Sequence, residues 1–348
     1  MTASLRLGTR GSTLARIQSS LVADALRAIG VEVELVSIVT AGDVRPPDTA
    51  WGEGAFVGEL ESALRSGAID LAVHSAKDVP IEPEVDLVIA AFPPRADPRD
   101  ALVLRGSGSA PSLHDAEGSP ATSAEAAGSL SMLPEGAIVG TDSPRRTGFL
   151  RSRRPDLRVV PLHGNVDTRL RRLDEGSVDA LILAVAGLER LGRADRISEI
   201  LAAETVPPAP GQGALAVQVR RSDDRLRAVV QQIDDPATRL AVTAEREVLR
   251  TTGGGCRAPI GALATVAGGG IAILAAAVAP SGEGARFERA QGASSEAMQL
   301  ARSVGRRLVA RGSVSADDES TADDWTARGA AAGESTGVGS LPDRSAVQ

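Results

Sequence analysis

The sequence predicts an α/β fold with largely parallel sheets, followed by a small α+β domain. Over the first 220 residues, short apolar runs typical of buried strands alternate with amphipathic helical stretches, which is the pattern of βαβ units. A segment rich in Pro and Gly at 207–215 interrupts this alternation. A long helical stretch and an uncharged stretch broken by three glycines come next, and they indicate a second, smaller architecture.

The elements expected in the first part of the chain are short and closely spaced. The helix that begins at Ser12 has an apolar stripe at helical spacing, formed by Leu14, Ile17, Leu21, Val22 and Leu26. The expected strands are 5–9, 31–40, 69–75, 85–92, 137–141 and 177–187, and the expected helices are 12–30, 56–67, 144–154 and 167–175. Residues 106–131 are rich in Gly, Ser and Ala, so we expect a long exposed loop there.

The C-terminal part begins with a clear helix signal at Asp235–Pro236. Asp is a favoured N-cap and Pro a favoured first helical residue, and we expect this helix to run to Thr252 and to end at Gly253. The uncharged stretch 258–282 leaves only 271–279 as a continuous apolar run, which is too short to span a bilayer. It predicts two strands joined by a glycine turn, within two or three strands over 260–291. A helix at about 294–311 and a disordered tail at 313–348 complete the expectation.

Composition and charge argue against several classes of protein. A net charge of −7 and 2% aromatic residues are unlike a general nucleic-acid binder. A single cysteine excludes an intramolecular disulfide and fits a reducing compartment, and the N-terminus lacks the apolar segment of a secretory signal. We therefore expect a cytoplasmic protein. Residues 140–196, however, contain 12 Arg against 8 Asp and Glu, which indicates an anionic ligand bound by the middle of the chain.

Arginine lies at three expected helix starts, although the helix dipole disfavours cations there. An anion bound at such a position would be held by free N–H groups and guanidinium together. The residues concerned are Arg10 with Ser12, Ser143 with Arg145 and Arg146, and Asn165 with Arg169. Three such starts on strand-to-helix turns favour a binding site over a solvated surface.

Two further positions carry candidate chemistry. Lys77, the only lysine, and Asp78 come after the strand at 69–75, where open α/β sheets bind ligands, although an exposed turn with an ion pair explains them equally well. Cys256 comes after three glycines, which would give a reactive thiol access, whereas a structural cysteine is usually buried. His74, His114 and His163 show no ligand spacing with Cys256, so we expect no zinc site.

Nine segments, taken together and in order, resemble the porphobilinogen deaminase (hydroxymethylbilane synthase) family over residues 5–311. They are LGTRGS (7–12), AVHSAKDVP (72–80), DPRDALV (97–103), GTDSPRR (140–146), GNVDTRL (164–170), LILAVAGLERLG (181–192), PAPGQGAL (208–215), VTAERE (242–247) and GGGCRAPIG (253–261).

The resemblance implies two periplasmic-binding-protein-like α/β lobes with mainly parallel sheets and a small α+β C-terminal domain. The implied boundaries are 1–98 with 212–230, 99–207, and 235–312, ahead of the tail 313–348. It also implies a monomeric enzyme that joins four porphobilinogens head to tail, releasing ammonia and the linear tetrapyrrole hydroxymethylbilane. The primer is a dipyrromethane cofactor bound to Cys256 through a thioether.

The resemblance assigns roles to residues that already attracted attention. Asp78 would assist loss of ammonia, stabilise the azafulvenium cation and help remove the proton after carbon–carbon bond formation. The cofactor would be bound by Ser75, Lys77, Ser143, Arg145, Arg146, His163 and Asn165, and the substrate by Arg10, Ser12, Phe56, Arg169 and Arg190. Arginine suits this task because each pyrrole carries an acetate and a propionate group.

The chain departs from the family pattern at three positions. His163 lies where arginine is common, Glu53 where many relatives have lysine, and Asp142 where a small hydroxyl residue is usual. These changes leave room for a weakened family member. Two other interpretations also remain: a two-lobed protein that binds a dicarboxylate without chemistry, and a cysteine hydrolase with His163 as base.

Overall fold

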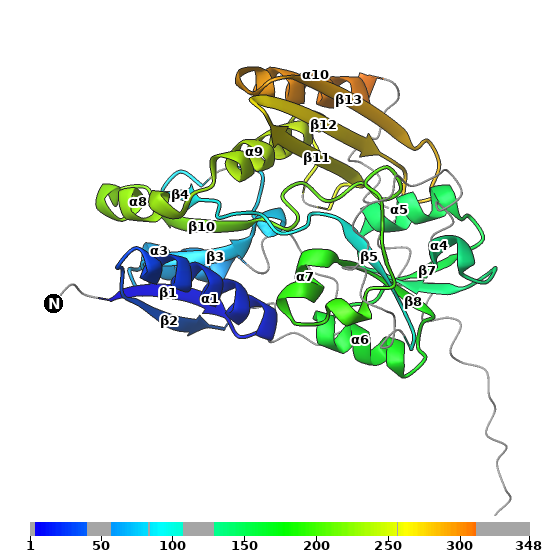
Figure 1. The fold of residues 1–348 in the computed structure, drawn as a ribbon, viewed down its shortest axis with the longest axis horizontal. Helices are drawn as coiled ribbons and strands as arrows, with labels where there is room; N and C mark the ends of the chain where they lie inside the picture. The colour runs from blue at the N-terminus through cyan, green and yellow to red at the C-terminus, as the bar shows by residue number, and fades with distance from the viewer. Residues whose placement is uncertain (1–3, 40–56, 83, 107–128, 256, 311–348) are drawn as a thin grey trace, which may run out of the picture. The chain divides into compact units, whose positions relative to one another are not determined.

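The computed structural model describes residues 4–39, 57–82, 84–106, 129–255 and 257–310, and Figure 1 shows its elements. Within these residues the strands form two five-stranded sheets and one three-stranded sheet. Each sheet packs its apolar face against helices from its own part of the chain. We refer to the first two sheets, with the helices packed on them, as the first and second lobe.

The first lobe is built on a sheet with the order β2-β1-β3-β10-β4. Its strands are β1 (Leu5–Arg10), β2 (Val33–Ile38), β3 (Leu71–Ser75), β4 (Leu87–Ala91) and β10 (Leu215–Arg220). Its helices are α1 (Thr13–Ala28), α3 (Gly58–Arg65), η1 (Ala76–Asp78), α8 (Asp224–Val230) and η4 (Gln231–Ile233). β1 is parallel to β2 and β3, whereas β10 is antiparallel to both of its neighbours. Leu7, Leu26 and Val217 lie in the core of this lobe.

The second lobe has a sheet with the order β7-β6-β8-β5-β9. Its strands are β5 (Asp100–Leu104), β6 (Ile138–Gly140), β7 (Arg158–Val160), β8 (Ala180–Ala184) and β9 (Glu199–Ile200). Its helices are α4 (Ser129–Met132), α5 (Pro144–Arg153), α6 (Val166–Asp174), α7 (Val185–Arg190) and η3 (Ala194–Arg196). Here β6 is parallel to β7 and β8, and β5 is antiparallel to β8 and β9. Phe149 and Leu181 are completely buried in this lobe.

The two lobes share one strand arrangement, and the chain passes between them twice. After β4 it leaves the first lobe and enters the second as β5, and after β9 it returns to the first lobe as β10. In each sheet the strand on which the chain arrives from the other lobe, β10 in the first and β5 in the second, lies fourth in the order and is the antiparallel one. The segments 92–99 and 201–214 therefore connect the lobes.

The C-terminal part is a three-stranded antiparallel sheet covered by two helices. It consists of α9 (Pro236–Thr252), β11 (Ile260–Ala267), β12 (Gly270–Ala277), β13 (Arg286–Ala293), η5 (Ser294–Glu296) and α10 (Ala297–Ala310). Gly268 and Gly269 have positive φ angles in the tight turn between the first two strands. Apolar side chains of both helices pack onto the sheet, with Val248, Ile273 and Val304 at the centre of this core.

The predicted fold class is confirmed, and most expected elements end within a few residues of the observed ones. The helix signal at Asp235–Pro236 is confirmed, because Asp235 accepts a hydrogen bond from Thr238 N and Gly253 ends the helix in the left-handed conformation. The two strands joined by a glycine turn within 258–282 are confirmed as well. Among the described residues, no helix has the length and apolarity needed to cross a bilayer.

Two expectations were wrong in detail. The run 177–187 is not one strand, because β8 ends at Ala184 and the helix α7 begins at Val185. Both pieces are buried and apolar, so their hydrophobicity could not mark the boundary. The end of the expected loop 106–131 is also wrong, since the short helix α4 begins at Ser129. Residues 107–128 and the tail from 311 lie outside the described residues.

Candidate functional site

The turn that comes after β3 carries Lys77 and Asp78 on the short helix η1. Ala76 N donates to Ala214 O at 3.0 Å, which ties this turn to the segment leading into β10. Lys77 Nζ donates to Gln212 Oε1 at 3.3 Å. Burial lowers the pKa of Lys77 to about 8, and the nearby arginines Arg145 and Arg146 add to this effect, while Asp78 opposes it. The only lysine of the chain is thus a desolvated cation at the end of a parallel strand.

Strand β3 is fixed immediately before this turn by a buried polar chain. Gln218 Nε2 donates to Glu61 Oε1 at 2.9 Å, so the amide oxygen of Gln218 accepts from His74 Nε2 at 3.0 Å. Burial lowers the pKa of His74 to about 4 and raises the pKa of Glu61. Ser75 accepts a hydrogen bond from Gln18 Nε2 at 3.0 Å.

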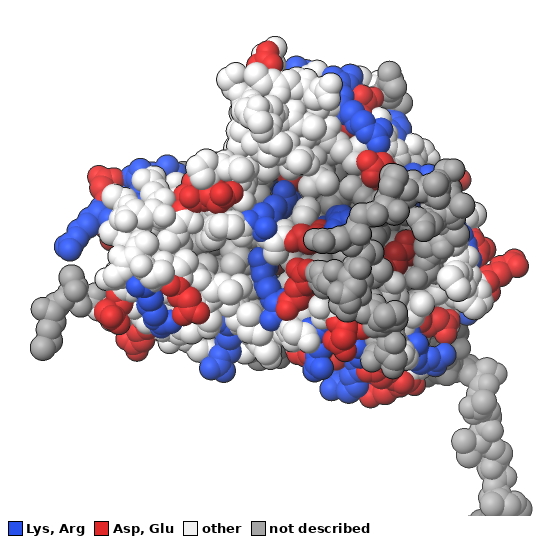
Figure 2. Space-filling model, viewed as in Figure 1, with Lys and Arg blue, Asp and Glu red and all other residues white. Residues whose placement is uncertain are grey.

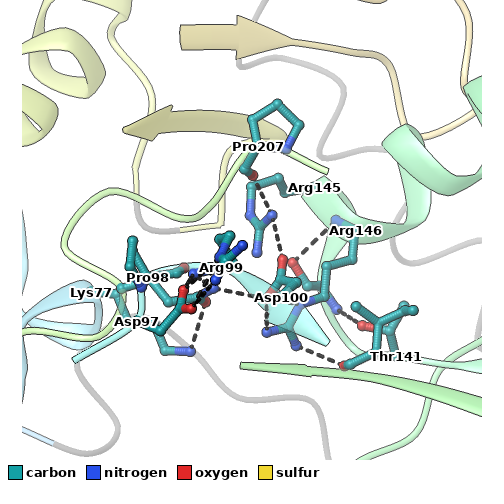
Figure 3. A network of polar contacts seen from close by, with 12 residues as sticks. Lys77, Asp97, Pro98, Arg99, Asp100, Thr141, Arg145, Arg146 and Pro207 are labelled. Atoms are coloured by element: carbon teal, nitrogen blue, oxygen red, sulfur yellow. Dashed lines mark hydrogen bonds and ion pairs between the residues drawn. The ribbon is translucent and has the colours of Figure 1, made fainter. Parts of the chain in front are cut away.

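Across from this turn lies a buried ionic group that we call the Asp100 cluster, made of Asp100, Arg145, Arg146 and Gln212. Figure 3 shows Asp100 between the two arginines. Arg145 Nη1 lies 2.9 Å from Asp100 Oδ2, and Arg146 Nη2 lies 2.7 Å from Asp100 Oδ1. Gln212 Nε2 donates to the same Oδ1 at 2.8 Å. Burial alone would raise the pKa of Asp100, but the two guanidinium groups hold it well below its usual range.

Both arginines of the cluster come from the first turn of α5, as the sequence predicted. Ser143 caps this helix by accepting from Arg146 N, and Pro144 opens it. Arg146 Nη1 also donates to Ile182 O at 3.0 Å, and Arg145 donates to Pro207 O. Asp100 neutralises one of the two positive charges, so the cluster keeps one net positive charge in a buried setting. Anion binding by these arginines stays a prediction, and it has to use donors that these contacts leave over.

A third cation lies beside the cluster at the start of α6. Asn165 caps this helix by accepting from Thr168 N at 2.8 Å, and Arg169 Nε donates to Gly164 O at 2.9 Å. Burial lowers the pKa of Arg169 to about 10, Arg146 lowers it further, and Asp142 opposes them. Desolvated cations that lower one another's pKa favour a bound anion.

The two described departures from the family pattern contact each other. His163 Nδ1 lies 3.0 Å from Asp142 Oδ1, and the side chains are 15% and 21% exposed. An arginine and a hydroxyl at these positions would carry one positive charge, whereas a paired carboxylate and imidazole carry none or one negative charge. The two departures, His163 and Asp142, therefore together lower the net charge at one place in the site.

The remaining predicted residues lie at the lobe ends or outside the described residues. Ser12 caps α1 by accepting from Ala15 N, shortly after Arg10 at the end of β1. Arg190 Nη2 donates to Gly213 O at 2.7 Å, which links α7 to the segment that returns to the first lobe. Basic side chains are visible near the middle of the face in Figure 2, with acidic side chains beside them. Cys256, Phe56 and Glu53 lie outside the described residues.

The sequence reasoning missed Asp100 and Gln212, the two residues that hold the cluster together. Both lie inside motifs that carried the resemblance, DPRDALV and PAPGQGAL. A signal was present for Asp100, because it is a charged residue directly before the buried strand residues Ala101, Leu102 and Val103. A buried acid in that position requires a cationic partner.

Comparison with known proteins places this site in context. The model of the porphobilinogen deaminase dipyrromethane cofactor-binding domain matches residues 5–228, and that of the porphobilinogen deaminase C-terminal domain matches residues 239–310. The chain belongs to the porphobilinogen deaminase family. The porphobilinogen deaminase of Acidothermus cellulolyticus is 46% identical over 315 residues, covering 88% of this chain and 89% of that protein. That of Roseiflexus castenholzii is 44% identical over 299 residues, covering 84% and 92%.

Among solved structures, the methionine-binding protein MetQ matches with a TM-score of 0.40 and 13% identity, over 66% of this chain and 89% of that chain. The family is one of transferases, and its first domain binds a dipyrromethane cofactor.

The residues of the site fit such a cofactor. A dipyrromethane built from two porphobilinogens carries four carboxylates, and the site offers buried and half-buried cations with few acids to neutralise them. Lys77, Arg145 and Arg169 each have a pKa lowered by burial, which a bound carboxylate would offset. Among the described residues there is no group of three or more His, Cys, Asp and Glu able to hold a metal ion.

Proposed function

We propose that this chain is a hydroxymethylbilane synthase, which condenses four porphobilinogens head to tail and releases ammonia and the linear tetrapyrrole hydroxymethylbilane. The observation that carries the proposal is the convergence of cations from both lobes, half-buried in the first lobe and buried in the second. Lys77 of the first lobe and Arg145 and Arg146 of the second lobe meet through Gln212 and Asp100. A substrate rich in carboxylates suits a site of this kind.

The cofactor in this proposal is a dipyrromethane joined to Cys256 by a thioether. When bound, it would supply the free pyrrole carbon to which the first porphobilinogen is added, and each later unit would be added to the last ring of the growing chain. Its carboxylates are held by the cationic donors Lys77, Arg145 and Arg146. The polar neighbours Ser75, Ser143, His163 and Asn165 complete the binding set.

Asp78 is the catalytic residue of the proposal. Its carboxylate binds pyrrole N–H groups and stabilises the positive charge that develops on the substrate as ammonia leaves. It then accepts, at a carboxylate oxygen, the proton released when the new carbon–carbon bond has formed. Asp78 is an exposed residue of the turn, which leaves its carboxylate accessible to a substrate.

The incoming porphobilinogen is bound by a second set of residues at the ends of both lobes. Arg10 and Ser12 act from the first lobe, Arg169 and Arg190 act from the second, and Phe56 belongs to the same set. Arg190 already spans the two, because it donates to the backbone of the returning segment at Gly213.

The organisation proposed with this function has three domains, 1–98 with 212–230, 99–207 and 235–312, ahead of the tail 313–348. The protein acts as a cytoplasmic monomer on a small molecule, without nucleic acid or membrane as a partner. Size-exclusion chromatography with light scattering at several concentrations tests the monomer.

Intact-mass spectrometry tests the proposed function directly. Protein produced in a host that supplies porphobilinogen should carry an adduct of two pyrrole units, and the Cys256→Ser protein should show only the unmodified mass. An unmodified wild-type mass under these conditions contradicts the proposal. If the wild-type thiol is instead free and alkylation abolishes a hydrolase activity, the cysteine hydrolase with His163 as base is correct.

A further inference from the structure

The helix α9 of the C-terminal part contacts the turn that carries Lys77 and Asp78. Arg246 Nη1 donates to Val79 O at 2.9 Å and to Ala76 O at 3.4 Å, and Arg246 Nη2 donates to Pro80 O at 2.6 Å. The accepting carbonyls lie on both sides of Lys77 and Asp78. One half-buried guanidinium thus binds the backbone of the whole turn from outside its own lobe.

Apolar packing supports the same contact. Val242, one helical turn before Arg246, is completely buried and shares a small core cluster with Ala76 and Val79. Ile81, just beyond the turn, packs against the core of the C-terminal part. The turn is therefore held against α9 along its length and not only at one hydrogen bond.

The neighbouring residue Glu245 holds the turn indirectly. Its side chain is completely buried, and Oε2 accepts from Gly211 N at 2.7 Å. A Cβ on Gly211 would lie 3.2 Å from the backbone of Ala76 and 3.3 Å from Lys77 N, so this glycine sits directly on the turn. Glu245 also pairs with Arg95 on the other connecting segment at 2.6 Å. The adjacent residues Glu245 and Arg246 of α9 therefore bind the two connections between the lobes and the turn itself, respectively.

We propose that Arg246 is a positioning residue, which fixes the backbone of the turn 76–80 so that Lys77 and Asp78 are presented in one arrangement. This inference rests on the role of Asp78 in the proposed function. The same helix ends at Thr252, and Cys256 lies four residues later in the sequence. Arg246 thereby couples the catalytic turn to the helix that leads to the cofactor-bearing cysteine.

The helix offers a matched control in Arg239. Like Arg246, it donates to a backbone carbonyl of the first lobe, with Arg239 Nη2 2.7 Å from Ala90 O, and it pairs in addition with the carboxylate of Asp234. Its contact is with strand β4 and not with the catalytic turn. Arg239→Met therefore removes an arginine that only anchors α9 to the first lobe. Arg246→Met removes the arginine that we propose positions the turn.

The experiment compares the cofactor-loaded wild-type, Arg246→Met, Arg246→Lys and Arg239→Met proteins. Deuterium uptake of peptides covering 72–82 should rise in Arg246→Met and remain at the wild-type level in Arg239→Met. We expect kcat of Arg246→Met to fall about tenfold or more with KM for porphobilinogen little changed, because a small misplacement of a reacting group is costly. Arg246→Lys, which reaches fewer carbonyls, should lie between wild type and Arg246→Met in both measurements.

Equal deuterium uptake and equal kcat in Arg246→Met and Arg239→Met would overturn the inference, as would a loss of kcat explained by melting temperature alone. If Arg246→Met does not fold, the Arg246→Lys protein decides the question by the same two measurements. Failure of the proposed function is distinguishable, because the wild-type protein would then carry no adduct and show no turnover, while the change in deuterium uptake would still be measurable.

Discussion

The two lobes share one strand order but differ in the element that comes after the third strand of that order. In the first lobe, β3 leads into η1, which carries Lys77 and Asp78. In the second lobe, β8 leads into α7, whose first residues Val185 and Ala186 are buried and apolar. The equivalent position therefore carries ionisable side chains in one lobe and buried apolar side chains in the other.

The antiparallel strands show the opposite difference. In the first lobe, β10 begins with Leu215, which pairs with Ser75. In the second lobe, β5 begins with Asp100, which pairs with Ala184. The second lobe thus places its carboxylate inside the protein, where it organises two arginines, and the first lobe places its carboxylate on the turn after β3. In the proposed function the two carboxylates have different tasks: Asp100 organises the arginines of the second lobe, which bind anions together with Lys77, and Asp78 of the first lobe carries the proton chemistry.

The largest effect is expected for Asp78→Asn, which removes the proposed proton acceptor of the first lobe. Turnover should fall by about 10²–10⁴-fold, the usual contribution of a general acid or base, while the cofactor stays attached. The control is Asp86→Asn, which alters an exposed carboxylate of the same lobe paired with Arg65 and should keep wild-type turnover. Near-normal turnover of Asp78→Asn would show that the assignment of Asp78 is wrong.

Asp100→Asn tests the second lobe, where the carboxylate is structural. It leaves two buried arginines without their counter-ion, so the free energy of unfolding should fall by about 3–5 kcal/mol in urea titrations. Asp97→Asn, which breaks the more exposed pair with Arg99, should cost only about 1 kcal/mol or less. Equal losses of unfolding free energy in the two variants would mean that the Asp100 cluster does not organise this lobe.

Lys77 of the first lobe gives the proposed cofactor binding a pH dependence. Its pKa is lowered to about 8, so its charge is lost as the pH rises through this value. The affinity of cofactor-free protein for the dipyrromethane carboxylates should therefore fall about tenfold between pH ~8 and pH ~9.5. Lys77→Arg keeps its charge over this range, so its affinity should not change with pH. Both proteins are compared by measuring cofactor loading with mass spectrometry at each pH. If the affinity of Lys77→Arg falls in the same way, a group other than Lys77 is responsible for the pH dependence.

The smallest effect concerns the contact between His163 and Asp142. His163→Arg should lower KM for porphobilinogen about threefold, because it restores a permanent positive charge near the second lobe's arginines. Since the two side chains lie 3.0 Å apart, Asp142→Ser combined with His163→Arg should give a non-additive gain in a double-mutant cycle. Strict additivity would show that the two departures act independently.

Much of this arrangement was predictable from local sequence, and its central contact was not. Helix starts at Ser12, Ser143 and Asn165 result from short-range capping rules, and the structure confirms the cap at each. The pairing of Asp100 with Arg145 and Arg146 joins residues about 45 positions apart in the sequence, and it depends on which strands are neighbours. Alternation of strands and helices predicts the class of the sheet but not the strand order or the one antiparallel strand.

The division between the lobes is tested most directly by the intact masses of Asp78→Asn and Arg145→Gln, produced in a host that supplies porphobilinogen and shown to be folded by circular dichroism. The Asp78→Asn protein should carry the adduct of two pyrrole units, because Lys77 and the arginines that bind the cofactor are intact. The Arg145→Gln protein should show only the unmodified mass. An unmodified Asp78→Asn protein together with a fully loaded Arg145→Gln protein would contradict the assignment of cofactor binding to the second lobe's arginines and of proton chemistry to Asp78.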